Sequence, residues 1–222
     1  FSQLEFRTAV FLAQDKQGMK DIANGVDVHQ YTANIIGCSR QDAKAHTFKP
    51  LYGGMMGKKK EVEYYEKFLK KYKGIAKWHL DLQERAYKTS IVRLPSGREY
   101  YFPNVYKRPN RYTGEYIYSN STNIKNYPVQ GFATADIVPL ACMNVWELLK
   151  ERGLQSIIIN TVHDSVVLDV HPDEVDDVIS IIKTGFINVK DSLLTRYNCE
   201  LNVPLDFEIK KGKNWLDLST VI

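Results

Sequence analysis

The spacing of apolar and polar residues predicts a mainly helical chain. Apolar positions recur every three or four residues in several segments, as one buried helix face requires. Asp27 and Ser39 can each cap the N-terminus of a helix, and Gly37 can end the helix that begins after Asp27. The predicted helices cover residues 28–36, a segment from Arg40 that kinks or tightens near Pro50, 58–72, 75–87, 132–151, and a stripe from Val175 to Val189.

Strand patterns are fewer and shorter. Residues 1–14 predict a strand end running into a helix, and two β-rich runs around Pro95-Ser-Gly97 predict a hairpin. Residues 103–125, rich in tyrosine and turn formers, predict a long loop or irregular ribbon. Two β-branched runs, 157–162 and 166–170, flank His163-Asp164-Ser165, and a last strand is expected near 201–209.

These elements predict an α/β (α+β) fold with antiparallel sheet. A helical insert over about residues 15–118 interrupts a strand-and-helix body made of residues 1–14 and 119–222.

Composition narrows the class of protein. The 222 residues are 44% apolar and 25% charged, as in ordinary globular domains. The net charge of +4 is concentrated in lysine-rich segments between residues 58 and 73 and near 107–111, which suits either phosphate binding or a solvated helix face. Three separated cysteines argue against a zinc knuckle and for a reducing compartment. No signal peptide or long apolar run is seen, so we expect no membrane span and a cytoplasmic location.

Candidate chemistry gathers in two places. Arg40, Lys44, Phe48 and Tyr52 recur every fourth residue, so two cations and two aromatic rings share one helical stripe. Cations suit phosphates and flat rings suit bases, although an ordinary amphipathic helix shows the same spacing. Asp164 lies at a predicted hairpin tip, which could present a metal ligand or simply stabilise the turn.

Six segments, in order, resemble the motifs of family A DNA polymerases (the DNA polymerase I type). Arg-xxx-Lys-xxx-Phe-xxx-Tyr-Gly at 40–53 resembles motif B, Val162-His-Asp164 resembles motif C, and Ser2-Gln-Leu-Glu-Phe-Arg7 resembles motif A without its first residues. The other three are Asp27-Val-His29, Asn126-Tyr-Pro-Val-Gln130-Gly and Gly212-Lys-Asn-Trp215. The resemblance implies an antiparallel-sheet palm (1–14 and 119–222) and a mainly helical fingers subdomain (15–118).

The resemblance also implies roles for individual residues. Asp164 and the Phe1 backbone carbonyl would bind the two Mg²⁺ ions of a nucleotidyl transfer, and Arg40 and Lys44 would grip the phosphates and serve catalysis. The incoming dNTP would contact Gln3, Glu5, His29, Arg40, Lys44, Phe48 and Tyr52. Glu5 would exclude a 2′-hydroxyl and bond the Tyr52 hydroxyl, and Phe48 in place of Tyr would disfavour dideoxynucleotides. The primer–template would contact Asn126, Gln130, His163 and Gly53.

The sequence departs from the family pattern at several points. The motif A carboxylate would immediately precede Phe1, so we expect that carboxylate and the thumb to come from an upstream remainder, as part of a longer chain, as a second polypeptide, or across a splicing junction. Without it, primer extension is not expected. Ser165 stands where Glu is usual, Thr122 where Arg is expected, and Lys49-Pro50 replaces a small and apolar pair.

Two other functions fit parts of the pattern. A single-subunit phage-type RNA polymerase shares the Arg-xxx-Lys and Tyr-Gly spacing, but Glu5 and Phe48 favour deoxynucleotides. A non-catalytic primer–template-binding subunit would keep the fold and bind DNA with a steep salt dependence.

Overall fold

A computed structural model describes residues 1–111, 114 and 116–221. The chain divides into two compact units, which are described one at a time. Unit 1 contains Phe1–Leu4, Phe132–Leu201 and Leu205–Ile222, and unit 2 contains Glu5–Gly131 and Asn202–Pro204.

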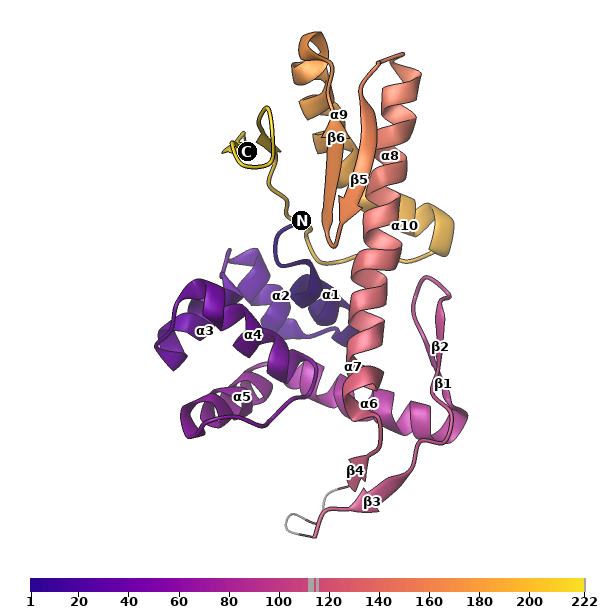
Figure 1. The fold of residues 1–222 in the computed structure, drawn as a ribbon. Coiled ribbons are helices and arrows are strands. Elements are labelled where there is room, and N and C mark those ends of the chain that lie inside the picture. The colour runs from indigo at the N-terminus through magenta and orange to yellow at the C-terminus, as the bar shows by residue number, and fades with distance from the viewer. Residues whose placement is uncertain (112–113, 115, 222) are drawn as a thin grey trace. The chain divides into compact units, whose positions relative to one another are not determined.

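Unit 2 is mainly helical and carries two small antiparallel hairpins (Figure 1). Its hairpins pair β1 (Ile91–Arg93) with β2 (Glu99–Tyr101) and β3 (Lys107–Pro109) with β4 (Tyr116–Tyr118). Its helices are α1 (Leu4–Ala13), α2 (Lys16–Ala23), α3 (Val28–Ile36), α4 (Arg40–Leu51), α5 (Lys59–Lys71), α6 (Lys73–Thr89) and α7 (Ser121–Gln130).

Side-chain caps fix where several of these helices begin. The predicted caps are confirmed: Asp27 accepts hydrogen bonds at the start of α3, and Ser39 accepts one from the Asp42 amide at the start of α4. The buried Asp15 carboxylate serves two helices, because it accepts from the Gly18 amide of α2 at 2.8 Å and from the Ile75 amide of α6 at 3.0 Å. Residues far apart in sequence are thereby joined at one carboxylate.

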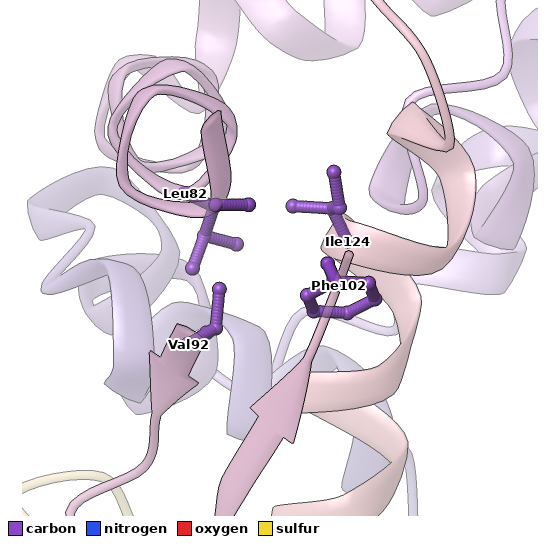
Figure 2. Close-up of a cluster of buried hydrophobic side chains, with 5 residues drawn as sticks. Leu82, Val92, Phe102 and Ile124 are labelled. Carbon is purple, nitrogen blue, oxygen red and sulfur yellow. The ribbon is translucent and has the colours of Figure 1, made fainter. Parts of the chain in front are cut away.

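An apolar cluster joins α6 to the first hairpin and to α7. Figure 2 shows Leu82 of α6, Val92 of β1, Phe102 and Ile124 of α7 meeting there, each at most 3% exposed. Trp78, Tyr100 and Val105 cover its edges. This core fixes α7, which carries Asn126 and Gln130, against the helices before it.

Three buried hydroxyl groups connect α3, α4 and α5. Thr32 Oγ1 lies 2.8 Å from Thr47 Oγ1 and 2.6 Å from the Tyr64 hydroxyl. Thr32 and Thr47 also bond the carbonyls of Val28 and Ala43 in their own helices. Since all three side chains are at most 1% exposed, this cluster fixes the register between the helix carrying His29 and the helix carrying the cationic–aromatic stripe.

Unit 1 combines helices with a longer hairpin. A π-helical segment (Gly131–Ile137) leads into α8 (Val138–Glu151), and β5 (Ile157–Val162) pairs with β6 (Ser165–Asp169). A 3₁₀ turn (Pro172–Glu174), α9 (Val175–Ile187), α10 (Val189–Tyr197) and the short pair β7 (Lys210–Lys211) and β8 (Ser219–Thr220) follow. Asn144 of α8 donates to the Gly185 carbonyl of α9 at 2.8 Å, so these two helices approach closely.

Helices with small antiparallel sheets confirm the predicted α/β (α+β) class. Several element boundaries were predicted wrongly. Helix begins at Ser121 rather than near residue 132, and the segment expected as a loop contains β3 and β4; residues 112, 113 and 115 of that segment lie outside the described residues. No strand forms at residues 1–3 or 201–209. Gly74 lies inside α6, and the break falls at Tyr72 instead.

The helical run Ser121–Glu151 is, by length and mean hydropathy of 1.3, apolar enough to cross a membrane. Half of its most apolar window is buried inside the protein, however, and Asp136 within it is only 5% exposed. A buried core helix gives the same signal, so this run does not by itself indicate a membrane span.

Candidate functional site

The start of α4 presents an arginine held by a single carboxylate. Asp27 Oδ2 accepts a hydrogen bond from Arg40 Nε at 2.7 Å, while Asp27 Oδ1 caps α3 through the His29 and Gln30 amides. Burial alone would raise the pKa of Asp27, but the bonds from Arg40 and the two amides outweigh it, so the pKa is lowered. Because only Nε is used, the two terminal guanidinium nitrogens of Arg40 stay available for a second anion.

His29 is buried and neutral. Burial lowers its pKa to about 4, and the cations Arg40 and Lys44 act in the same direction while Asp27 opposes them. Its Nδ1 has no hydrogen-bond partner among the residues that the structure describes. Its ring meets Phe48 edge-on, with 5.4 Å between ring centroids. An unpartnered buried polar atom of this kind calls for an explanation, and a ligand is one.

The predicted stripe along α4 is continuous. Arg40 is exposed, Lys44 is half-buried, and the Phe48 and Tyr52 rings stack with 6.0 Å between centroids and 15° between planes. Within the described ranges, Lys44 forms no ion pair. The stripe therefore offers two cations followed by a flat aromatic surface, as its spacing predicts.

Tyr52 joins three distant segments of unit 2 through its hydroxyl group. It donates a short hydrogen bond to the Glu5 carboxylate of α1, and Gln130 of α7 also bonds the hydroxyl. Burial, together with the Glu5 charge, raises the pKa of Tyr52 well above its ordinary value. The hydroxyl therefore stays protonated and holds Glu5 in a fixed position at the end of the α4 stripe.

The turn after α4 packs against a lysine. Gly53 has a φ of +75°, a backbone conformation that favours glycine, and a Cβ added there would lie 2.5 Å from Lys125 Nζ, the flexible end of that side chain. Burial lowers the pKa of Lys125 to about 8. On the next helix, His79 donates from Nε2 to the Leu51 carbonyl at 2.9 Å, and burial followed by the Lys125 charge lowers its pKa to about 3.

Unit 1 carries the predicted hairpin aspartate. Val162 pairs with Ser165 across a two-residue turn in which His163 has a φ of 54°, so Asp164 lies at the tip of the β5–β6 hairpin. The Phe1 amino group donates to the Asp164 carbonyl oxygen at 3.0 Å. Burial lowers the pKa of this amino group, although Asp164, Asp206 and Glu208 act in the opposite direction. The first residue of the sequence therefore contacts the tip of the hairpin.

Metal-binding capacity at this tip is limited. Among the described residues, no three His, Cys, Asp or Glu side chains gather in a way that could hold a metal ion. Magnesium in phosphoryl-transfer sites takes one or two protein carboxylates and completes its shell with water and substrate phosphates. The half-exposed Asp164 carboxylate fits one of those positions.

The structure groups the predicted site residues by unit. Unit 2 holds Glu5, His29, Arg40, Lys44, Phe48, Tyr52, Gly53, Asn126 and Gln130, whereas unit 1 holds Phe1, Gln3, His163 and Asp164. The Asn126 Oδ1 atom is buried and has no hydrogen-bond partner in the described part of the chain.

Sequence reasoning missed two contributors. Asp27 was recognised as a helix cap but not as the counter-ion of Arg40, and Lys125 was not singled out at all. The pairing of Asp27 with Arg40 depends on how α3 and α4 pack, which no local spacing encodes. A lysine immediately before Asn126 was visible in the sequence, but its contact with Gly53 arises only from the packing of α7 against the end of α4.

Comparison with known proteins places these observations in a family. A DNA polymerase I of Caldicellulosiruptor bescii is 29% identical over 98% of this chain, and one of Lactococcus lactis subsp. cremoris is 27% identical over 98%. The chain spans about a quarter of their length, 26% and 25% respectively. A solved structure, the POL domain of Pol1 from M. smegmatis in complex with DNA primer-template and dNTP, matches 85% of this chain and 36% of its own, with a TM-score of 0.69 and 23% identity, and so shares the fold. The sequence model for DNA polymerase family A matches residues 1–217, and the chain therefore belongs to that family.

Proposed function

We propose that this chain forms the nucleotide-binding fingers and part of the catalytic palm of a DNA-directed DNA polymerase, which adds deoxynucleotides to a primer 3′ end. The observation that carries the proposal is the hydrogen-bonded cluster of Glu5, Tyr52 and Gln130. These residues come from the segments resembling motif A, motif B and the Asn-x-Pro-x-Gln-Gly element, and they converge on one hydroxyl. Convergence of three separate motifs is the expected property of a shared binding site.

Each residue of the α4 stripe then has a physical task. Arg40 and Lys44 bind the triphosphate, and their charge stabilises the negative charge that develops as pyrophosphate leaves. Phe48 and Tyr52 support the sugar and the base pair. The fixed Glu5 carboxylate occupies the space that a 2′-hydroxyl would need, so ribonucleotides are excluded. His29, neutral at physiological pH, can donate one hydrogen bond to a phosphate oxygen when α3 and α4 adjust.

The DNA and metal ligands complete the proposal. Asn126 and Gln130 contact the minor groove, whose acceptors report pairing geometry more than sequence. Asp164 provides one carboxylate for Mg²⁺, with the Phe1 carbonyl beside it. Two bound Mg²⁺ ions would stabilise the attacking and leaving oxygens. The second carboxylate would come from the residue before Phe1, the position that the resemblance to motif A assigns to it.

Primer extension tests the proposal directly. The polypeptide containing these residues, together with the segment that supplies the second carboxylate, should extend a labelled primer with dNTPs and Mg²⁺. Asp164→Asn and Lys44→Ala should each lower the extension rate by about 100-fold or more, because each removes charge stabilisation of the transition state. Lys190→Ala, an exposed lysine of α10, serves as the matched control and should leave the rate unchanged.

Substrate selection separates this function from its alternatives. Glu5→Ala should admit ribonucleotides while wild type rejects them, and wild-type use of ribonucleotides would instead indicate an RNA polymerase. Primer–template binding without any nucleotide addition, even when the upstream segment is supplied, would indicate a non-catalytic DNA-binding subunit. Full extension activity in Asp164→Asn would refute the assignment of the catalytic residue.

A further inference from the structure

Lys125 is a partly buried cation for which no anion is provided. It forms no ion pair or hydrogen bond with any described residue, and the only charged or titratable group acting on it from a neighbouring element is His79, which is neutral. Burying an ammonium group without a counter-charge is unfavourable, so such groups are kept where an anion arrives from outside.

The Lys125 side chain lies against the turn that ends α4. Its Nζ, Cδ and Cε atoms occupy the space beside Gly53, where a Cβ would come within 3.0 Å of all three. Glycine at 53 leaves room for this side chain. The side chain is therefore laid along the turn that ends α4, with α7 fixed behind it by the apolar cluster around Ile124.

We propose that Lys125 binds a phosphodiester group of the primer–template, across the backbone of Gly53. This assignment rests on the proposed polymerase function and adds a DNA-backbone contact to it. A phosphate is the expected anion because an ammonium group binds phosphate oxygens as a point charge, and Lys125 immediately precedes Asn126, which is assigned to the duplex.

The alternative anion, the nucleotide triphosphate, lies too far along the helix. Lys44 is nine residues before Gly53, which corresponds to about 13 Å along a helix axis at ~1.5 Å per residue. In contrast, Lys125 immediately precedes Asn126 and shares α7 with Gln130, both assigned to the DNA duplex. A DNA phosphate is therefore the anion within reach of this ammonium group.

The salt dependence of binding provides the test. The polypeptide that includes the upstream segment is compared as wild type and as Lys125→Met. Its affinity for a fluorescently labelled primer–template is measured by anisotropy at several salt concentrations between low and moderate. Methionine keeps the unbranched apolar contact with Gly53 but has no charge. We expect about tenfold weaker binding at low salt, the size of one hydrogen bond to a charged group, and a log–log salt slope smaller by about one. Lys125→Arg should retain the slope, and Lys190→Met is the control.

The outcomes separate this inference from the proposed function. An unchanged salt slope in Lys125→Met, with tight binding by wild type, overturns the Lys125 assignment and leaves the polymerase proposal intact. Failure of the wild-type polypeptide that includes the upstream segment to bind primer–template overturns the polymerase proposal itself. Should Lys125→Met melt at a lower temperature than wild type, the comparison of Lys125→Gln with Lys125→Arg decides the same question, since they differ in charge.

Discussion

The buried hydroxyl cluster of Thr32, Thr47 and Tyr64 predicts that three substitutions together destabilise less than two of them. Burial raises the pKa of Tyr64 to about 12, so all three groups carry a proton at neutral pH. Three protons are thus shared among four short contacts, two of them to helix carbonyls that already accept backbone bonds. The cluster therefore has more acceptor positions than hydroxyl protons. It is destabilised most when a substitution leaves a buried hydroxyl without any acceptor.

The numbers of lost hydrogen bonds and unsatisfied donors set the expected change in unfolding free energy for each variant. Thr47→Val leaves Tyr64 donating to Thr32 and Thr32 donating to the Val28 carbonyl, so the loss should be about 0.5–1 kcal/mol. The loss of unfolding free energy in Thr32→Val alone is limited, because the Tyr64 hydroxyl also bonds Thr47. The double variant Thr32→Val/Thr47→Val leaves the buried Tyr64 proton with neither partner and should cost about 3 kcal/mol, two lost bonds plus one unsatisfied donor.

Adding Tyr64→Phe to the double variant removes the unsatisfied donor. The triple variant should recover about 1–2 kcal/mol relative to the double variant, because an entirely apolar replacement of matched shape is nearly neutral. Tyr64→Phe in the wild-type background, where it removes a satisfied bond, should destabilise by about 1 kcal/mol. The same substitution therefore changes sign with its background.

Urea unfolding followed by far-ultraviolet circular dichroism measures these differences, provided the slope of the unfolding free energy with denaturant is the same in wild type and all five variants. A triple variant that is less stable than the double variant would show that the Tyr64 proton finds another acceptor, and the reasoning about donors would be refuted.

Three further predictions concern the site. Asp27→Asn keeps the α3 cap but loses the charge beside Arg40, so the unfolding free energy should fall by at most about 0.5 kcal/mol. Asp27→Ala also loses the cap, so the fall should be about 1–2 kcal/mol. Urea titrations measure both values, and equal losses would show that the cap contributes nothing. His79 is neutral when folded, with a pKa of about 3 against an ordinary 6.5, so its stabilisation is complete above pH 6.5 and lost as pH falls toward 3. At pH 5 that loss is about 2 kcal/mol, and His79→Gln should flatten the pH profile of thermal unfolding; an equally steep profile would contradict this. Phe48→Tyr should increase chain termination by dideoxynucleotides in a primer-extension assay, and no increase would refute the placement of Phe48 beside the sugar.

The sequence was sufficient for local features and for the family, and insufficient for contacts set by packing. The caps Asp27 and Ser39, the glycine that ends α3, and a hairpin with Asp164 at its tip follow from short-range stereochemistry, and each is confirmed, although the connection is two residues long rather than the expected three. Tightening near Pro50 is confirmed too, since the Gly53 amide bonds the Pro50 carbonyl across three residues.

The errors arose where tertiary structure overrides local preference. The long helix was expected to start near residue 132, yet Pro128 lies inside α7, where it is buried together with Ile124 and Val129. The segment expected as a strand at residues 201–209 accepts isolated backbone hydrogen bonds, from the Ser2 amide at Asp206 and from the Val221 amide at Ile209, rather than forming a strand ladder. Likewise, nothing near Arg40 or Gly53 in the sequence points to Asp27 or Lys125 as their contacts.

The double role of Asp15 links two helix starts that are 57 residues apart, from Gly18 to Ile75. If the Asp15 carboxylate moves away, the Gly18 and Ile75 amides lose their acceptor together. In native-state hydrogen exchange these amides should therefore open as one cooperative unit, so that the beginning of the chain and the middle of it share a single local unfolding event.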